Sequence, residues 1–172
     1  RLATVTQFIE QYWPEAKLLH ARTAAQAFGV TNGYSEAERL GVDRWLALIA
    51  ARTHYTLPLC IIDCGTALPV DYLDLNGVHQ GGFITAGLGL MRQALAHNTA
   101  DLPFIQDSEK SLNFADNTQT AIYNGTLLTA VAFIEQLAAH YPNAQLLLTG
   151  GDAPIIAKQL HCPYQLNQDL VL

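Results

Sequence analysis

The sequence has few cysteines, few cations and no cysteine pair of the kind that binds zinc. Cys60, Cys64 and Cys162 form no Cys-x-x-Cys motif, which argues against a disulfide scaffold and against a zinc ribbon. We expect them to be buried, reduced thiols of a cytosolic protein. Only 9 Lys and Arg oppose 15 Asp and Glu, for a formal net charge of −6. A nucleic-acid binder normally presents a basic face, so we expect no nucleic-acid partner.

Long apolar segments and targeting signals are also missing. The longest apolar runs, such as residues 59–62 and 146–148, are strand-sized and far below the roughly 20 residues that span a bilayer. We recognise no signal peptide. The sequence therefore predicts a cytoplasmic protein without a membrane partner.

What the chain does contain is enough apolar sequence to fold. Half of its 172 residues are apolar and 14% are charged, which suits one domain or two small lobes. Helical and strand patterns alternate, which predicts an α/β fold. We expect helices over residues 5–12, from 43, from 87, over 118–138 and from 152, and strands over 59–63, 68–73, 78–84 and 145–149. Residues 102–105 are a further candidate element, and 163–172 are expected to be extended or loop.

The string Asp63-Cys64-Gly65-Thr66 follows a buried strand. Backbone N–H groups and a Thr hydroxyl in such a turn can hold phosphate oxygens, and the carboxylate can hold a cation. Asp and Gly are also common in ordinary turns, so the string alone leaves both interpretations open.

Asp43 and Arg44 form an adjacent acid and base at the start of a helix. They could simply be residues typical of a helix start, where the acid lies near the positive end of the helix dipole and the base lies in solvent. Alternatively, the carboxylate takes a proton from a substrate hydroxyl while the guanidinium binds a substrate carboxylate.

Glycine pairs follow two other strands. Gly81-Gly82 permits close approach of a ligand or simply a bulge. Gly150-Gly151 leads from a strand into a helix that Asp152 is placed to cap, and it offers a backbone-lined surface for a nucleotide. It lacks the Lys of a Walker A loop. Thr118, at the start of a long helix, is expected to be a helix cap.

Taken together and in order, these strings closely resemble type III pantothenate kinase from about residue 34 to the end. They are Asn32-x-Tyr34, Gly41-Val42-Asp43-Arg44, Asp63-Cys64-Gly65-Thr66, Gly81-Gly82, Asn117-Thr118 and Gly150-Gly151-Asp152. The resemblance implies a transferase that phosphorylates pantothenate with ATP to give 4′-phosphopantothenate, the first step of coenzyme A biosynthesis. It also implies ribonuclease-H-like lobes of the actin, Hsp70 and sugar kinase superfamily, a homodimer, Mg²⁺ and a monovalent cation such as K⁺ or NH₄⁺.

The resemblance also implies residue roles. Asp43 resembles the general base, and Asp63 the ligand of the monovalent cation. The residues implied to bind pantothenate are Tyr34, Gly41, Arg44 and, reaching into the neighbouring subunit, Thr118. Those implied to bind the nucleotide or its phosphates are Thr66, Gly82, Gly150 and Gly151.

The chain departs from the family pattern in several places. Ala37, Pro69 and Ala86 stand where the family usually has Pro, Thr and Pro, and Pro69 requires an edge or an unbonded strand position. The family's opening Asp-x-Gly-Asn-Thr loop, which binds phosphate and Mg²⁺, does not occur before Tyr34. We therefore expect residues 1–57 to be the end of a first lobe, including the substrate-binding helix, and 58–172 to be the second lobe. These 172 residues alone are expected to be inactive.

Three alternatives remain open. A non-catalytic accessory-factor relative would be expected to have lost Asp43 or Asp63, and both are present. Another kinase of the superfamily, acting on a sugar or short acid, would lack Gly-x-Asp-Arg beside a Tyr. A purely structural module would be favoured by Asp43 and Arg44 paired in solvent, away from Thr66.

Overall fold

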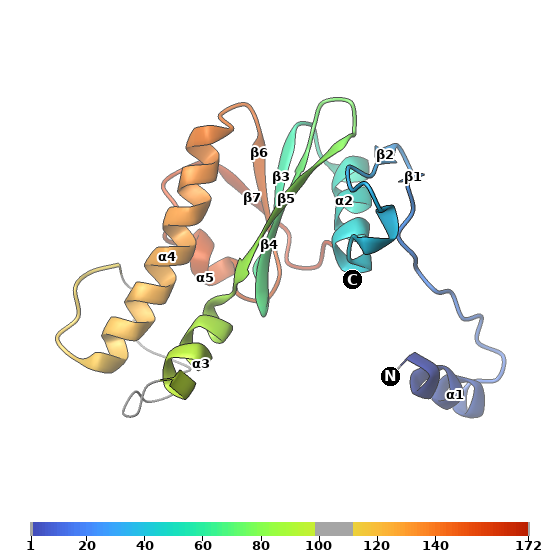
Figure 1. The fold of residues 1–172 in the computed structure, drawn as a ribbon, viewed down its shortest axis with the longest axis horizontal. Helices are drawn as coiled ribbons and strands as arrows, with labels where there is room; N and C mark the ends of the chain where they lie inside the picture. The colour runs from blue at the N-terminus through green and yellow to red at the C-terminus, as the bar shows by residue number, and fades with distance from the viewer. Residues whose placement is uncertain (1, 99–111, 172) are drawn as a thin grey trace.

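The computed structural model describes residues 2–98 and 112–171, and these form the mixed α/β fold predicted from the sequence (Figure 1). The candidate element at 102–105 lies outside the described residues. The elements in chain order are α1 (Leu2–Tyr12), β1 (Gln26–Ala27), β2 (Val30–Thr31), the 3₁₀ helix η1 (Ala37–Arg39), α2 (Val42–His54), β3 (Leu59–Asp63), β4 (Ala67–Leu73), β5 (His79–Ala86), α3 (Leu88–Asn98), α4 (Thr118–His140), β6 (Gln145–Thr149), α5 (Ala153–Ala157) and β7 (Tyr164–Leu166).

Five strands form the main sheet in the order β5-β4-β3-β6-β7. β3, β4 and β5 are antiparallel neighbours, whereas β6 runs parallel to β3 and β7 parallel to β6. This is the ribonuclease-H-like arrangement expected from three hairpin-connected strands followed by helices. The short strand β7 lies in the tail for which the sequence indicated only extended chain or loop. Pro69 lies in β4, one residue before Val70, where the pairing with β3 has ended and only the pairing with Ile84 of β5 continues.

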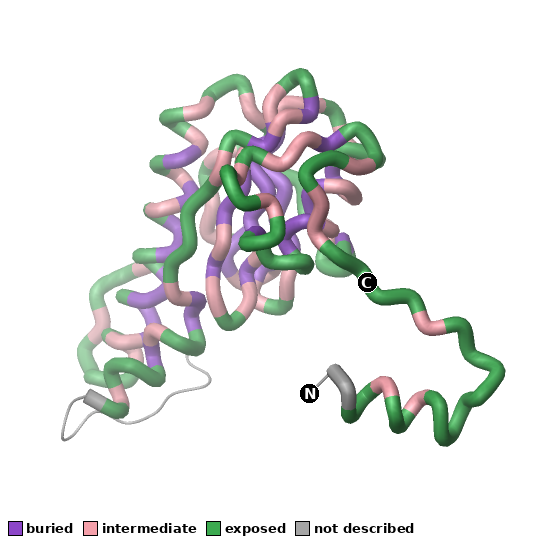
Figure 2. Tube along the Cα trace, turned by 45° about the vertical axis from the view of Figure 1, so that its right-hand side comes forward, coloured by how far each residue is buried: buried purple, intermediate pink, exposed green. Residues whose placement is uncertain are grey.

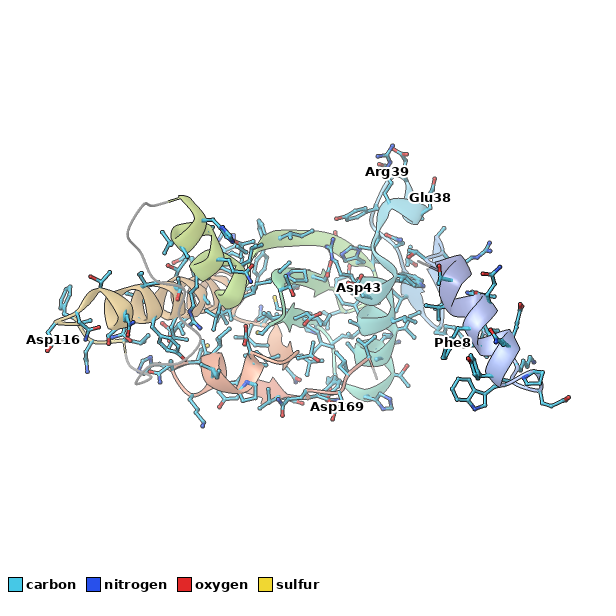
Figure 3. All side chains as sticks on the ribbon, turned by 90° about the horizontal axis from the view of Figure 1, so that it is seen from below. Phe8, Glu38, Arg39, Asp43, Asp116 and Asp169 are labelled. Atoms are coloured by element: carbon cyan, nitrogen blue, oxygen red, sulfur yellow. The ribbon has the colours of Figure 1, made fainter. Side chains whose placement is uncertain are left out.

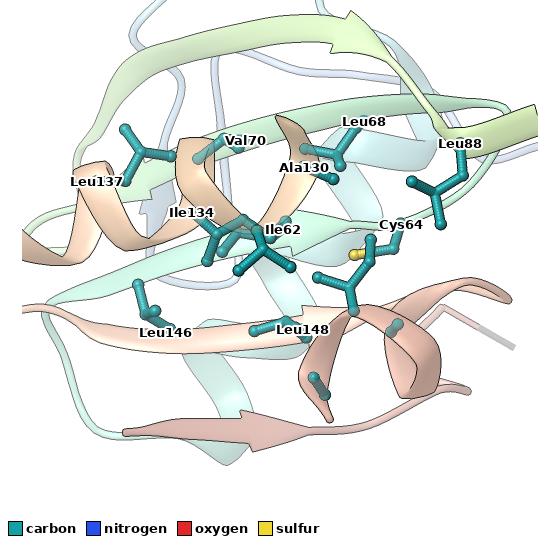
Figure 4. Packing of buried hydrophobic residues seen from close by; sticks show 14 of the residues in the cluster. Ile62, Cys64, Leu68, Val70, Leu88, Ala130, Ile134, Leu137, Leu146 and Leu148 are labelled. Atoms are coloured by element: carbon teal, nitrogen blue, oxygen red, sulfur yellow. The ribbon is translucent and has the colours of Figure 1, made fainter. Parts of the chain in front are cut away.

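Helices cover both faces of the sheet because its strands alternate apolar side chains between them. On one face, Ile62, Val70 and Leu148 pack under α4 and α5 (Figure 4). On the other face, α2 places Trp45 and Leu48 against the sheet. Burial is accordingly concentrated in the middle of the molecule (Figure 2).

Two helix ends differ from the sequence prediction. Asn117, not Thr118, caps α4, because its side chain accepts a hydrogen bond from the Thr120 amide at 2.9 Å. Asp152 stands at the cap position of α5 but makes no capping side-chain hydrogen bond. Its backbone is already helical, so it does not have the extended conformation that turns a cap side chain over the first turn. Pro154 lies in the first turn of α5, where its missing N–H costs no helical hydrogen bond.

The N-terminal helix α1 stands apart from the sheet and leaves Phe8, Tyr12 and Trp13 exposed (Figures 1 and 3). α2, although placed before the predicted boundary at residue 57, shares an apolar core with β3. That boundary stays a prediction. Of the three free thiols, Cys162 is only half-buried, whereas the other two are buried as expected. Within residues 2–98 and 112–171, no helix has both the length and the apolar character needed to cross a membrane.

Candidate functional site

The start of α2 presents the candidate base. The Asp43 side chain is exposed, and its Oδ1 accepts a hydrogen bond from the backbone N–H of Arg44 at 2.9 Å. Gly41 precedes the helix, and a Cβ at that position would collide with Asp43 Oδ1. Gly41 therefore leaves room for this exposed carboxylate.

Arg44 is buried rather than free, and its partner is Asp71 instead of Asp43. Nε donates to Asp71 Oδ2 at 2.8 Å and Nη2 to Oδ1 at 2.6 Å, while Nη1 donates to the Tyr34 hydroxyl at 3.0 Å. Burial alone would lower the pKa of Arg44, but the hydrogen bonds and charge of Asp71 outweigh it and raise that pKa. Burial likewise opposes ionisation of Asp71, yet hydrogen bonds from His79 and Arg44 hold the pKa of Asp71 below its usual range.

Sequence reasoning missed two members of this cluster, Asp71 and His79. His79 is fully buried, its Nε2 lies 2.7 Å from Asp71 Oδ1, and its ring stacks on Tyr34 with centroids 5.8 Å apart. One signal was available, because Asp71 interrupts the apolar positions of an otherwise core-forming strand. A charged residue there requires a buried partner.

The loop after β3 and the turn after β6 are brought together, as the parallel pairing of these strands requires. The Cys64 amide donates to Thr149 O at 2.7 Å, and the Asp152 amide donates to Cys64 O at 2.9 Å. Gly150 adopts a φ of +88° at this junction. A Cβ there would lie 2.8 Å from Cys64 O and would collide with Asp63 Oδ1, so glycine permits the close packing of the two loops.

Asp63 ends β3 close to the candidate base. Burial raises the pKa of Asp63, and the negative charge of Asp43 raises it further. Two carboxylates that repel each other favour a bound cation, and carboxylate oxygens suit both alkali ions and Mg²⁺. Asp63 is therefore a single candidate ligand, and the described residues contain no group of three or more His, Cys, Asp or Glu side chains that could hold a metal ion.

A hollow of about 310 Å³ lies beside this loop. Its lining joins the predicted phosphate residues Thr66 and Gly151 with residues of α3; the full set is Cys64, Gly65, Thr66, Gly89, Leu90, Gln93, Gly151 and Asp152. The backbone N–H groups of Cys64, Gly65 and Asp152 already donate to carbonyl oxygens within the protein, so Thr66 is the predicted phosphate residue whose side-chain hydroxyl lines this hollow.

The structure does not bring Gly82 to this hollow. Gly82 pairs with Asp71 across the β4–β5 ladder, and a Cβ there would lie 3.0 Å from Asp71 Oδ1 and 2.9 Å from the Val70 carbonyl carbon. Its lack of a side chain makes room for the Val70 carbonyl oxygen, with which a Cβ would collide, and for the buried carboxylate; its nucleotide role stays a prediction.

Thr118 also lies apart from the candidate base. It is exposed at the first residue of α4, on a groove between α3 and α4 that Met91 and Ile122 help to line. Figure 3 places Asp116, two residues earlier, at one end of the molecule, away from Asp43 near its middle. Its contribution across a subunit interface stays a prediction.

The family model described as type III pantothenate kinase matches residues 1–140. The chain belongs to this family. Proteins named type III pantothenate kinase are 37% identical in Nitrosococcus oceani, over 96% of this chain and 66% of the relative, and 39% identical in Hahella chejuensis, over 88% and 63%. The protein of that name in Halorhodospira halophila is 41% identical over 95% of this chain and 67% of its own length. The chain thus spans about two thirds of the length of these curated relatives.

A solved structure shares the fold. It is the crystal structure of a conserved putative Baf family transcriptional activator from Campylobacter jejuni, with a TM-score of 0.62 and 25% identity over 80% of this chain and 62% of that chain. In this type III pantothenate kinase family member, the predicted pantothenate residues Tyr34, Gly41 and Arg44 lie around the start of α2. The loop of Thr66 and the Gly150-Gly151 turn lie together at the ends of β3 and β6.

Proposed function

We propose that the full-length protein transfers the γ-phosphoryl group of ATP to the terminal hydroxyl of pantothenate, giving 4′-phosphopantothenate and ADP. This is the first step of coenzyme A biosynthesis. The observation that carries the proposal is the place of Asp43. Its exposed carboxylate belongs to the residue next to Arg44 in the chain, and its negative charge raises the pKa of Asp63, which supports a base that serves both groups of predicted binding residues.

The chemistry needs little more than positioning and charge neutralisation. The pantothenate oxygen forms a bond to the γ-phosphorus while the bond from that phosphorus to the ADP oxygen breaks. The hydroxyl proton passes to the carboxylate of Asp43, which acts as a general base. Arg44 and Tyr34 orient pantothenate, while Thr66 and the backbone of Gly151 face the phosphates.

Cations complete this arrangement in the proposal. Asp63 would hold the monovalent ion, K⁺ or NH₄⁺, and Mg²⁺ would accompany ATP. When bound, they neutralise phosphate charge. The proposal includes a homodimer in which Thr118 contacts the pantothenate of the neighbouring subunit, because the start of α4 lies away from α2 within one subunit (Figure 1). We place the reaction in the cytoplasm, where free thiols such as Cys60 persist.

The test is ATP consumption by the full-length protein, including any residues that flank these 172, with and without pantothenate and with and without K⁺ or NH₄⁺. Removing a general base typically costs about 10²–10⁴-fold in turnover, so Asp43→Asn should lose that much. Asp169→Asn, an exposed acid at another surface (Figure 3), is the matched control and should retain turnover. Undiminished turnover in Asp43→Asn, or a folded wild type that ignores pantothenate, would refute the proposal.

A further inference from the structure

A buried polar cluster lies between α2 and the β4–β5 hairpin, inside an otherwise apolar layer. The exposed fractions are 8% for Arg44, 4% for Asp71 and 0% for His79. Burying an ion pair gains little stability over apolar residues of similar size. The cluster therefore calls for an explanation other than stability.

Its hydrogen bonds have a direction. The Asp71 carboxylate accepts from Nε and Nη2 along one edge of the Arg44 guanidinium, and Nη1 donates to the Tyr34 hydroxyl. His79 supports Asp71 from the other side. An ionised carboxylate only accepts hydrogen bonds, so His79 Nε2 carries the proton and donates it. His79 Nδ1 is buried and has no hydrogen-bond partner in the described part of the chain, which is consistent with that assignment.

Tyr34 is held just as closely and reaches the surface. Its amide donates to Asn32 Oδ1 at 2.9 Å, and the Asn32 side-chain amide donates to Ala37 O at 3.1 Å. A Cβ at Gly33 would collide with the His79 carbonyl oxygen, so this loop rests directly on β5. The half-buried phenol ring thus stacks on His79 while its hydroxyl meets Arg44.

We propose that Asp71 and His79 are positioning residues of the pantothenate subsite: they fix the guanidinium of Arg44 so that Nη1 and the Tyr34 hydroxyl together face the substrate. The inference rests on the proposed function. Asp71 and Tyr34 already accept from three of the five guanidinium N–H groups, so Arg44 offers the substrate carboxylate the two that are left, one on Nη1 and one on Nη2, beside the phenol. Recognition then depends on how well Asp71 and His79 hold the guanidinium still.

His79 gives a cleaner test than Asp71, since removing Asp71 leaves a buried guanidinium unpaired and endangers folding. In the full-length protein, His79→Phe keeps a planar ring but loses the N–H donor. We expect the KM for pantothenate to rise about tenfold, equivalent to about 1.4 kcal/mol, while the KM for ATP and the kcat change less than about twofold. His79→Gln keeps a side-chain N–H donor and should recover most of the loss.

A double-mutant cycle asks whether His79 acts through Arg44. Lys cannot form the two-pronged contact with Asp71, so in an Arg44→Lys background His79→Phe should change the KM for pantothenate by less than about twofold. His161→Gln removes an exposed His–carboxylate pair elsewhere and serves as the matched control, with unchanged kinetics.

The outcomes separate the two proposals. A wild type without pantothenate-dependent turnover overturns both the proposed function and this inference. If the wild type is active, three results overturn the positioning role alone. They are parallel changes in kcat and both KM values in His79→Phe, failure of His79→Gln to restore the KM for pantothenate, and full additivity of His79→Phe with Arg44→Lys.

Discussion

Replacing Gly150 by Ala should destabilise the protein strongly, whereas the same change at Gly151 should not. Gly150 has a φ of +88°, and an L-residue in the left-handed region costs roughly 1–2 kcal/mol. The new Cβ would also lie 2.8 and 2.9 Å from the carbonyl oxygen and carbon of Cys64. That peptide is held by hydrogen bonds to Thr149 and Asp152, so it yields little, and overpacking of this kind costs about 1–3 kcal/mol.

The sum is about 3 kcal/mol for Gly150→Ala, which corresponds to a loss of about 6–12 °C in Tm for a protein of this size. Urea unfolding and calorimetry would measure it. A Cβ at Gly151 meets nothing within 4 Å, so Gly151→Ala should stay within about 0.5 kcal/mol of wild type. Gly151 lines the 310 Å³ hollow, however, and its substitution should raise the KM for ATP. Equal stability of the two variants would refute the reasoning about the loop junction.

Two further predictions concern ionisation. The pKa of Asp71 is lowered in the folded state, so the ionised carboxylate stabilises the fold at pH values above its unfolded pKa of about 3.9, and that stability is lost as the pH falls through the lowered pKa. Asp71→Asn should therefore lower the free energy of unfolding by about 3–5 kcal/mol at pH 7, measured by urea unfolding. This difference in stability between variant and wild type should narrow below about pH 4. A constant gap from pH 7 to pH 3 would contradict this. Burial raises the pKa of the Cys60 thiol to about 11, and burial together with the nearby carboxylates raises the pKa of Cys64 to about 12. A thiol reagent at pH 8 should therefore modify half-buried Cys162 first, and Cys60 and Cys64 only when the protein unfolds. Rapid labelling of all three thiols in the folded protein would count against it.

The sequence predicted most of the fold because the signals were local. Short, continuous apolar runs, residues 59–62 and 146–148, marked β3 and β6. β7 was missed because it is three exposed residues at the sheet edge, without the apolar alternation that announces a strand. The prediction of the α4 cap was wrong for a related reason. Asn117 and Thr118 can both cap a helix, and the choice between them depends on backbone angles that the composition does not reveal.

The candidate site was predicted only in part, because its second half depends on strand register. Asp71 pairs with Gly82, but two residues later Leu73 pairs with His79, so β5 carries one extra residue between these positions. Gly81, with a φ of +94°, lies within that bulge. Regular alternation from Gly82 would have turned Gln80 inward. The bulge turns His79 inward instead, where it meets Asp71.

Strand β4 carries side chains of opposite character to its two faces. Leu68 and Val70 enter the apolar layer under α4, and Asp71 faces Arg44 on the side of α2. A slip of one residue in the pairing would send the Asp71 carboxylate among the leucines and isoleucines under α4 and would leave the Arg44 guanidinium without its counterion. Each of these burials costs several kcal/mol, so the misaligned hairpin is far less stable than the native one. The ion pair thus favours the correct alignment of the hairpin, and the same alignment places Asp71 and His79 where Arg44 of α2 and the Tyr34 ring can meet them.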